Sequence, residues 1–510
     1  GRRRDLALRS ALGASRLQIL AEFFAEGLVL ALASGALALV LARVAISVLL
    51  RYVPEGVPRL SQVGIDGTAV AFALLVSVAA AVLVALLPTL PYSRPEVVAA
   101  LNEGGRGHTA GRQRVTTRRA LVALQMALGL VLLIGAGLMV RSFSKLSVVS
   151  PGFRPEGALS LRVSLPAAAY DEERVSTFVE DATRELAALP GVLAVGAVDS
   201  LPLTGSASGS GHTFEDFPLG ENDLPPVFIT NAADPGYREA LGIPLVEGRF
   251  FEPADHRDRR RVVVVNQTLA KRYWPNGGAL GRRISPGSPD REGWYEIVGV
   301  VGDLRFEDLQ TEPRGMVFYP ILGPEGSGGF GTNVSFVLRT AGTPESIAQP
   351  ARSAVWSVDP NVPITQVLTL EQLVRDSRAP MAFSMSLLLV ASALAVLLGA
   401  VGTYGVVSYV VSQRTQEIGV RMALGALPSQ MRERILRDGL ETALAGLLIG
   451  LLGAFALTRT LSSLLYSVSP LDPWSFILAP LLLLGVAVAS SLLPAERAAK
   501  VSPIVALRRD

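Results

Sequence analysis

Six segments of this chain are apolar over about 20 residues or close to it, the length a helix needs to cross a bilayer core of about 30 Å. One such segment could be a buried core helix, but six together predict an α-helical transmembrane bundle. The composition agrees, because 18% of the residues are charged, against about 25% in a typical soluble domain. The segments are residues 21–42, 67–90, 120–140, 380–411, 442–458 and 474–494.

The loops on the two sides of these segments differ in positive charge. The segments on the side of the N-terminus carry 20 arginine and lysine residues, whereas the two short loops on the other side carry 4. Because positively charged loops stay in the cytoplasm, the sequence predicts that both termini are cytoplasmic. Residues 142–379 are then expected on the opposite, non-cytoplasmic side of the membrane. The predicted cytoplasmic segments are 1–19, 91–119, 412–438 and 495–510, and the short outer loops are 43–66 and 459–473.

Residues 142–379 contain no further segment long enough to cross a bilayer. Their pattern predicts one large α+β domain. A strand, a helix and a strand follow one another twice, and two such units commonly pack as a ferredoxin-like fold. The stretch from about 205 to 332 is then an inserted subdomain, with a flexible entry predicted at the glycine- and serine-rich residues 204–211. The first unit is 158–165, 172–190 and 192–198, and the second is 334–340, 343–360 and 363–370.

The available residue types exclude several kinds of chemistry. The chain has no cysteine and three histidines far apart in sequence, so we predict neither a thiolate nucleophile nor a metal site. A P-loop needs a Gly-Lys-Ser/Thr triplet, and none of the three lysines stands in one. We therefore predict no catalytic residue, no cofactor and no ATP site on this chain, and the net charge of +3 does not indicate nucleic-acid binding.

Charged residues in the middle of a span would indicate an ion path. The acidic residues nearest the spans, which are Glu22, Glu26, Asp438 and Glu441, lie at predicted cytoplasmic ends, where they can reach water or an arginine. An ion-coupled secondary transporter is therefore a less favoured alternative.

A repeat on the cytoplasmic side is the most informative feature. Residues 5–20 align with 417–432 at a constant offset, and Asp66 ahead of one span matches Asp472 ahead of another. In both copies an acidic residue precedes an arginine by four positions, a spacing that forms an ion pair on one helix face, and a glycine follows that can end the helix. We interpret the repeat as a surface that docks a cytoplasmic partner twice; the alternative is an ordinary helix that contacts lipid headgroups.

At these residues the chain resembles the FtsX/MacB-type permeases of ABC transporters, which share a cytoplasmic stretch like RTQEIGVRMALGA. Residues 236–255, 262–284 and 295–306 resemble stretches of the MacB-like periplasmic core domain, and the duplication resembles the duplicated orphan permeases (ADOP type). By this resemblance, 1–119 is the end of a first FtsX-like unit, and a span with its own outer domain is expected before it. The second unit is the span 120–141, the periplasmic core domain 142–379 and the permease domain 380–510.

The resemblance implies a function and partners. Cytoplasmic ABC ATPases would bind ATP, push a coupling segment and move the periplasmic domain of an inner-membrane permease, exporting or extruding a substrate. Two units on one chain would replace a homodimer, and a periplasmic adaptor or outer-membrane channel is a further possible partner. Two alternatives stay open, a non-transporting regulator of a cell-envelope enzyme and a scaffold without an ATPase. The expected coupling residues are Asp5, Arg9, Gly13, Glu417, Gly419, Arg421 and Gly425, with Ala7 in the place of Gly419.

Overall fold

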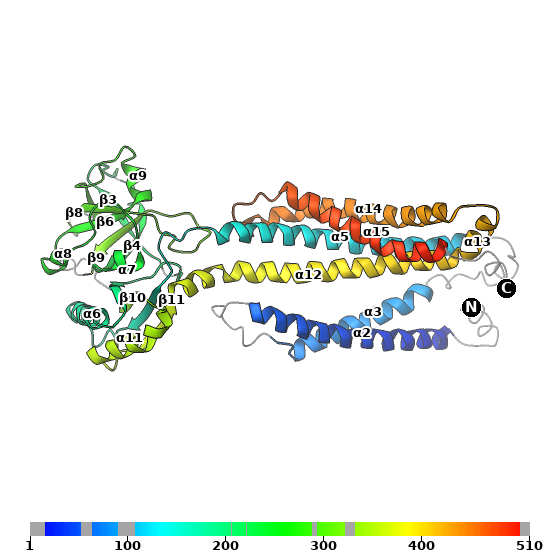
Figure 1. Ribbon diagram of the computed structural model, residues 1–510, viewed down its shortest axis with the longest axis horizontal. Helices are drawn as coiled ribbons and strands as arrows, with labels where there is room; N and C mark the ends of the chain where they lie inside the picture. Colours follow the sequence, from blue (N-terminus) through cyan, green and yellow to red (C-terminus); the bar gives the residue numbers. More distant parts are fainter. Residues whose placement is uncertain are drawn as a thin grey trace. The chain divides into compact units, whose positions relative to one another are not determined.

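The computed structural model describes residues 16–52, 64–89, 108–205, 207–220, 222–287, 293–321 and 332–499. It divides into two compact units, which we call the membrane unit (Gly1–Phe143 with Met381–Asp510) and the α+β unit (Ser144–Pro380). The predicted fold class, an α-helical bundle with one large α+β domain, is confirmed (Figure 1).

Among the residues that the structure describes, five helices are long and apolar enough to cross a membrane. The sixth predicted span, 67–90, forms α3 (Gly67–Thr89), but the apolar stretch described there, Gly67–Val82, is shorter. Six spans therefore remain an expectation, with five supported by length and composition. The five helices are α2 (Arg16–Tyr52), α5 (His108–Ser147), α12 (Leu370–Gln413), α14 (Pro428–Leu461) and α15 (Pro473–Ala499).

Helix α5 packs closely against α14 in the membrane unit. A Cβ placed on Gly446 would lie 2.6 Å from the carbonyl oxygen of Ala123, and one on Gly450 would lie 2.9 Å from the Cα of Ala127. Small residues at a helix contact let two backbones approach closely. Such close packing stabilises helix pairs in a bilayer, where the hydrophobic effect does not favour their association. Leu130 of α5 is fully buried in this contact.

The two aspartates matched by the repeat play the same structural part. Asp66 accepts a hydrogen bond from the backbone N–H of Ala69 at 2.8 Å at the start of α3, and Asp472 accepts one from the N–H of Ser475 at 3.0 Å at the start of α15. Asp472 also pairs with Arg141 of α5. Each carboxylate satisfies backbone donors that a helix start leaves free, so the repeat aligns equivalent helix starts.

Four strands of the α+β unit form the predicted ferredoxin-like sheet, in the antiparallel order β11-β1-β10-β2. Helices α6 and α11 contact each other and cover this sheet (Figure 1). The elements lie within three residues of the predicted ranges. They are β1 (Ala158–Ser164), α6 (Glu172–Ala187), β2 (Val192–Val198), β10 (Asn333–Thr340), α11 (Pro344–Val358) and β11 (Ile364–Thr369).

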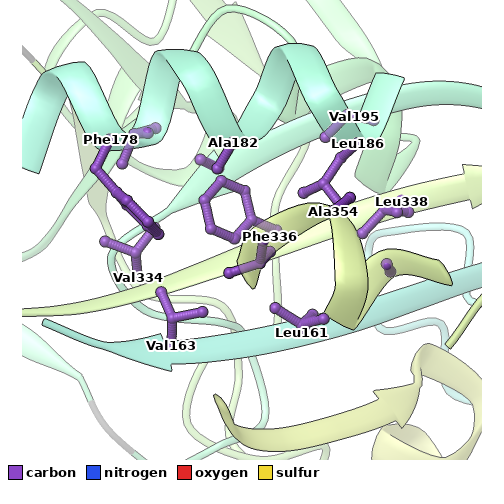
Figure 2. Packing of buried hydrophobic residues seen from close by; sticks show 14 of the residues in the cluster. Leu161, Val163, Phe178, Ala182, Leu186, Val195, Val334, Phe336, Leu338 and Ala354 are labelled. Carbon is purple, nitrogen blue, oxygen red and sulfur yellow. The ribbon is translucent and has the colours of Figure 1, made fainter. Parts of the chain in front are cut away.

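The core of this sheet lies between the strands and the two helices (Figure 2). Alternate residues of β10 point toward α6, because side chains alternate across a strand. Phe336 is fully buried, and its ring meets that of Phe178 edge to face at a centroid distance of 6.4 Å. Leu161 and Val163 of β1 complete the layer beside it.

The inserted strands close into a six-stranded ring, because β4 pairs with both β3 and β9. Closure removes unpaired strand edges. The predicted flexible entry at 204–211 is wrong in its second half, since β3 begins at Ser208 and a Cβ on Gly211 would lie 2.9 Å from Pro225. The glycines there provide space for a neighbouring strand. The elements of the insert are β3 (Ser208–Phe214), β4 (Val227–Ala233), α7 (Tyr237–Leu241), β5 (Leu245–Gly248), α8 (Pro253–Arg257), β6 (Val262–Asn266), α9 (Gln267–Tyr273), β7 (Arg283–Pro286), β8 (Tyr295–Val301) and β9 (Met316–Pro320).

The stability of the α+β unit is expected to depend on pH through Asp234. Its carboxyl lies buried after β4, and burial raises its pKa to about 7. The folded state therefore holds a proton that the unfolded chain releases above pH 4, so stability falls as pH rises from about 4 to 7. Between pH 5 and pH 7 the wild type should lose about 2–3 kcal/mol of unfolding free energy through this group, at about 1.4 kcal/mol per pH unit. Asp234→Asn should abolish this loss, because asparagine does not ionise.

Denaturant unfolding of wild type and Asp234→Asn at several pH values checks this. The buried histidines His212 and His256, whose pKa values burial lowers to about 4, act in both proteins and cancel in the difference. A difference between the two proteins that stays constant with pH would show that Asp234 is ionised in the folded state.

Candidate coupling segment

The second copy of the repeat forms a short helix between two long ones (Figure 1). Helix α12 ends at Gln413, α13 (Thr415–Ala423) follows after Arg414, and α14 starts at Pro428. Proline is favoured at the first position of a helix, because no backbone donor is needed there. The sequence thus specifies a helix, a tight turn and a new helix.

Gly425 ends α13 as predicted. Its φ of +98° lies in the left-handed region, which glycine enters without the steric cost other residues pay. The backbone N–H of Gly425 donates to the carbonyl of Met422 at 3.1 Å, and that of Ala426 to the carbonyl of Arg421 at 3.0 Å. This pair of bonds is the Schellman motif, and it fixes the direction in which the chain leaves α13.

One face of α13 is anchored by packing. Ile418 is 7% exposed and contacts a small core that includes Met431 of α14 and Ala498 of α15. Gly419 is also buried. These contacts hold α13 on two other helices, so a force on α13 would reach them.

The opposite face of α13 and the turn present exposed apolar side chains. Leu424 is 83% exposed, Leu427 59% and Val420 40%; we call these three residues the apolar tip. Adjacent exposed apolar residues often mark protein contacts. Reasoning from charges missed them, although the repeat contained a signal, since Leu8 and Leu12 stand at the positions of Val420 and Leu424 in the first copy.

The predicted ion pair of α13 is present. The guanidinium of Arg421 lies 2.6 Å from the carboxylate of Glu417, and both side chains are partly exposed. An exposed pair at this spacing contributes about 0.2–0.5 kcal/mol, so it has little effect on the stability of the helix. Both residues line a groove beside α13 rather than the apolar tip.

Asp438 joins three helices at this end of the membrane unit. Its carboxylate lies 3.1 Å from Arg119 of α5 and 3.5 Å from Arg414 at the start of α13. Glu441, one turn later, pairs with Arg437 at 3.3 Å. Both acids therefore meet arginines at the end of a span, as the sequence predicted, instead of lying within it.

The other predicted coupling residues, Asp5, Arg9 and Gly13, lie outside the residues that the structure describes. Of the seven, the four of the second copy are therefore placed. Glu417, Gly419 and Arg421 lie on α13 and Gly425 lies in the turn after it.

Helix α12 connects this segment with the rest of the chain. It begins at Leu370, directly after the last strand of the α+β unit, and runs as one helix of 44 residues to Gln413. At about 1.5 Å per residue this is about 66 Å. Pro380 lies within this helix and has no backbone N–H to donate, so the helix carries one missing hydrogen bond where the α+β unit ends.

Comparison with known families finds two matches. The family described as FtsX-like permease C-terminal matches residues 1–97 and 389–503, which include both copies of the repeat. The family described as MacB-like periplasmic core domain matches residues 120–356.

Individual relatives are more distant. YknZ of Bacillus subtilis (strain 168), an uncharacterized ABC transporter permease, is 26% identical over 289 residues, 55% of this chain and 70% of its own length. The macrolide export ATP-binding/permease protein MacB of Azoarcus sp. (strain BH72) is 24% identical over 415 residues, 77% of this chain, which spans 57% of MacB. The crystal structure of the periplasmic region of MacB from Actinobacillus actinomycetemcomitans aligns with 44% of this chain and 94% of its own, at 13% identity and a TM-score of 0.31.

Proposed function

We propose that this chain, which matches the FtsX-like permease and MacB-like periplasmic core domain families, transmits ATP-driven motion from a cytoplasmic ATPase to its α+β unit. The chain is a permease component of the ABC type, and ATP would be bound and hydrolysed on a separate ATPase chain. No cofactor or catalytic residue on this chain is required.

The observation that carries the proposal is that α12 is one helix from Leu370 to Gln413, with Pro380 within it. This helix joins the α+β unit to α13, and α13 presents the apolar tip on the face that its own packing leaves open. An ATPase that binds the tip and moves on ATP binding would displace α13, and α12 would carry the displacement to residue Leu370. Conduction of a solute between the helices is not needed for this mechanism.

The orientation of the chain is part of the proposal and gives a testable prediction. The charge bias of the loops supports cytoplasmic termini, a cytoplasmic α13 and a periplasmic α+β unit. Since the chain has no native cysteine, a maleimide can react only with the single cysteine that is introduced. We expect Thr177→Cys on α6 to react with a membrane-impermeant maleimide in intact cells, and Ser429→Cys on α14 to react only after lysis. Both positions are exposed, so burial does not hide either. Labelling of Ser429→Cys in intact cells would reverse the proposed orientation.

Export or extrusion of a periplasmic or outer-leaflet substrate such as a lipid, lipoprotein, peptide or drug fits a periplasmic domain moved by an ATPase. A regulator that controls a cell-envelope enzyme through the same motion is the second candidate, favoured by the same α12. A periplasmic adaptor, an outer-membrane channel and pairing of the two units as a pseudo-dimer belong to the first.

Affinity purification from membranes followed by mass spectrometry separates these candidates. Transport predicts an ATP-binding cassette ATPase with an adaptor or channel, and regulation predicts the ATPase with a cell-wall hydrolase. Recovery of the chain at normal levels without any ATPase would overturn the proposed function. The alternative of a scaffold without an ATPase would then be favoured.

A further inference from the structure

A groove lies beside α13 in the membrane unit, lined by residues of α5, α12, α13 and α14. Its wall is aliphatic and comes largely from the last turns of α12, with Val406, Val407, Val410 and Val411. Val122 of α5 and Ile435 of α14 contribute from the other helices. Such a wall suits a hydrocarbon chain.

The rim of the same groove is positively charged. Among the described residues, four arginines line it, and the carboxylates of Glu417 and Asp438 are the acidic groups, so this described lining has a net charge of +2. Asp438 is shared by two of the arginines, Arg119 and Arg414. Arg434 is exposed and makes no ion pair within the part of the chain that the structure describes. The rim therefore has positive charge that its own acids leave uncompensated.

Two tyrosines near the groove mark the level of the membrane surface. The guanidinium of Arg118 lies 4.0 Å from the ring centre of Tyr409, and Arg497 donates a hydrogen bond of 3.0 Å to the hydroxyl of Tyr404. Tyrosine and arginine gather where the hydrocarbon core meets the headgroups. Val406 and Val407 lie between these tyrosines along α12, and Val410 and Val411 follow Tyr409, so the groove lies at this boundary.

We infer that this groove binds one anionic phospholipid of the adjacent leaflet, with its phosphate at Arg434, Arg119 and Arg414 and an acyl chain along the valines of α12. Basic pockets between membrane helices bind anionic headgroups by this chemistry. The apolar wall is what distinguishes a lipid from a soluble phosphate, and the apolar tip, not the groove, is the surface suited to a protein. The leaflet is cytoplasmic if the orientation proposed above holds; the binding itself does not depend on that proposal.

Native mass spectrometry of the full chain in detergent, with added phosphatidylglycerol or zwitterionic phosphatidylethanolamine, tests the site. We expect one phosphatidylglycerol to be retained preferentially. Arg434→Gln should weaken its retention about fivefold to tenfold, as expected for one arginine near a charged headgroup, and Arg434→Lys should restore part of it. The matched control is Arg432→Gln on the same helix, because Arg432 is exposed but does not line the groove.

A second variant tests the wall without changing charge. Val410→Phe fills the groove and should also weaken retention of phosphatidylglycerol. The water-soluble headgroup glycerophosphoglycerol should not compete, because it lacks an acyl chain. Equal retention in Arg434→Gln and Arg432→Gln, equal retention of the two lipids, or full competition by the soluble headgroup would each overturn the inference. None of these outcomes depends on whether an ATPase binds, so the proposed function can fail separately.

Discussion

Replacing Phe336 with alanine should lower the free energy of unfolding of the α+β unit by about 3–5 kcal/mol, the cost of removing a large buried aromatic side chain from a packed core. Phe336 is fully buried between α6 and the sheet, and it also contacts the ring of Phe178 (Figure 2). Such a loss approaches half of the stability of a typical domain, which is about 5–15 kcal/mol.

Hydrogen exchange of the full chain, read on peptides of β1 and β10, measures this effect. Val227→Ala is the control, because Val227 is 60% exposed on β4, and a surface substitution usually changes stability by less than about 0.5 kcal/mol. If Phe336→Ala left the protection of both strands at the wild-type level, the described core would be wrong.

The second large effect is expected at the apolar tip. The double variant Leu424→Asp with Leu427→Asp should reduce binding of the ATPase at least about hundredfold, because each buried leucine contributes about 1.5–3 kcal/mol and each 1.4 kcal/mol is a factor of ten. The charge reversal Arg421→Glu should have a smaller effect, since Arg421 lines the groove beside α13. The amount of ATPase that co-purifies with each variant measures the loss.

Membrane expression should stay normal in these variants, because both leucines are exposed. Ser412→Asp, which adds a charge at an exposed position near the end of α12, is the matched control and should retain the ATPase. If as much ATPase co-purified with the double leucine variant as with the wild type, the apolar tip would not be the docking surface.

Local pattern was sufficient to predict much of this fold. The two strand-helix-strand units were visible because each buries one face with a regular period, and α6 and β2 lie where that period placed them. The apolar spans follow from length alone. At the coupling segment, the Glu417–Arg421 spacing and Gly425 predicted a helix and its end, because both are interactions within a few residues.

Long-range pairing was not accessible in the same way. The ring of the insert depends on parallel pairing of β4 with β9, in which Ile229 lies opposite Met316, 87 residues later, and the two strands share no local signal. The contact of Asp438 with Arg119 joins residues 319 positions apart. The apolar tip was missed for another reason, since exposure of a leucine depends on which neighbours cover it.

We propose that motion at α13 reaches the α+β unit through α12. The most direct test is an environment-sensitive fluorophore on Val148→Cys, an 84% exposed position just after α5 in the α+β unit, in the chain reconstituted with its ATPase. We predict that ATP with vanadate shifts the emission in the otherwise wild-type chain and leaves it unchanged in the double variant Leu424→Asp with Leu427→Asp. An emission that stays constant while the bound ATPase is trapped in its ATP state would contradict the account.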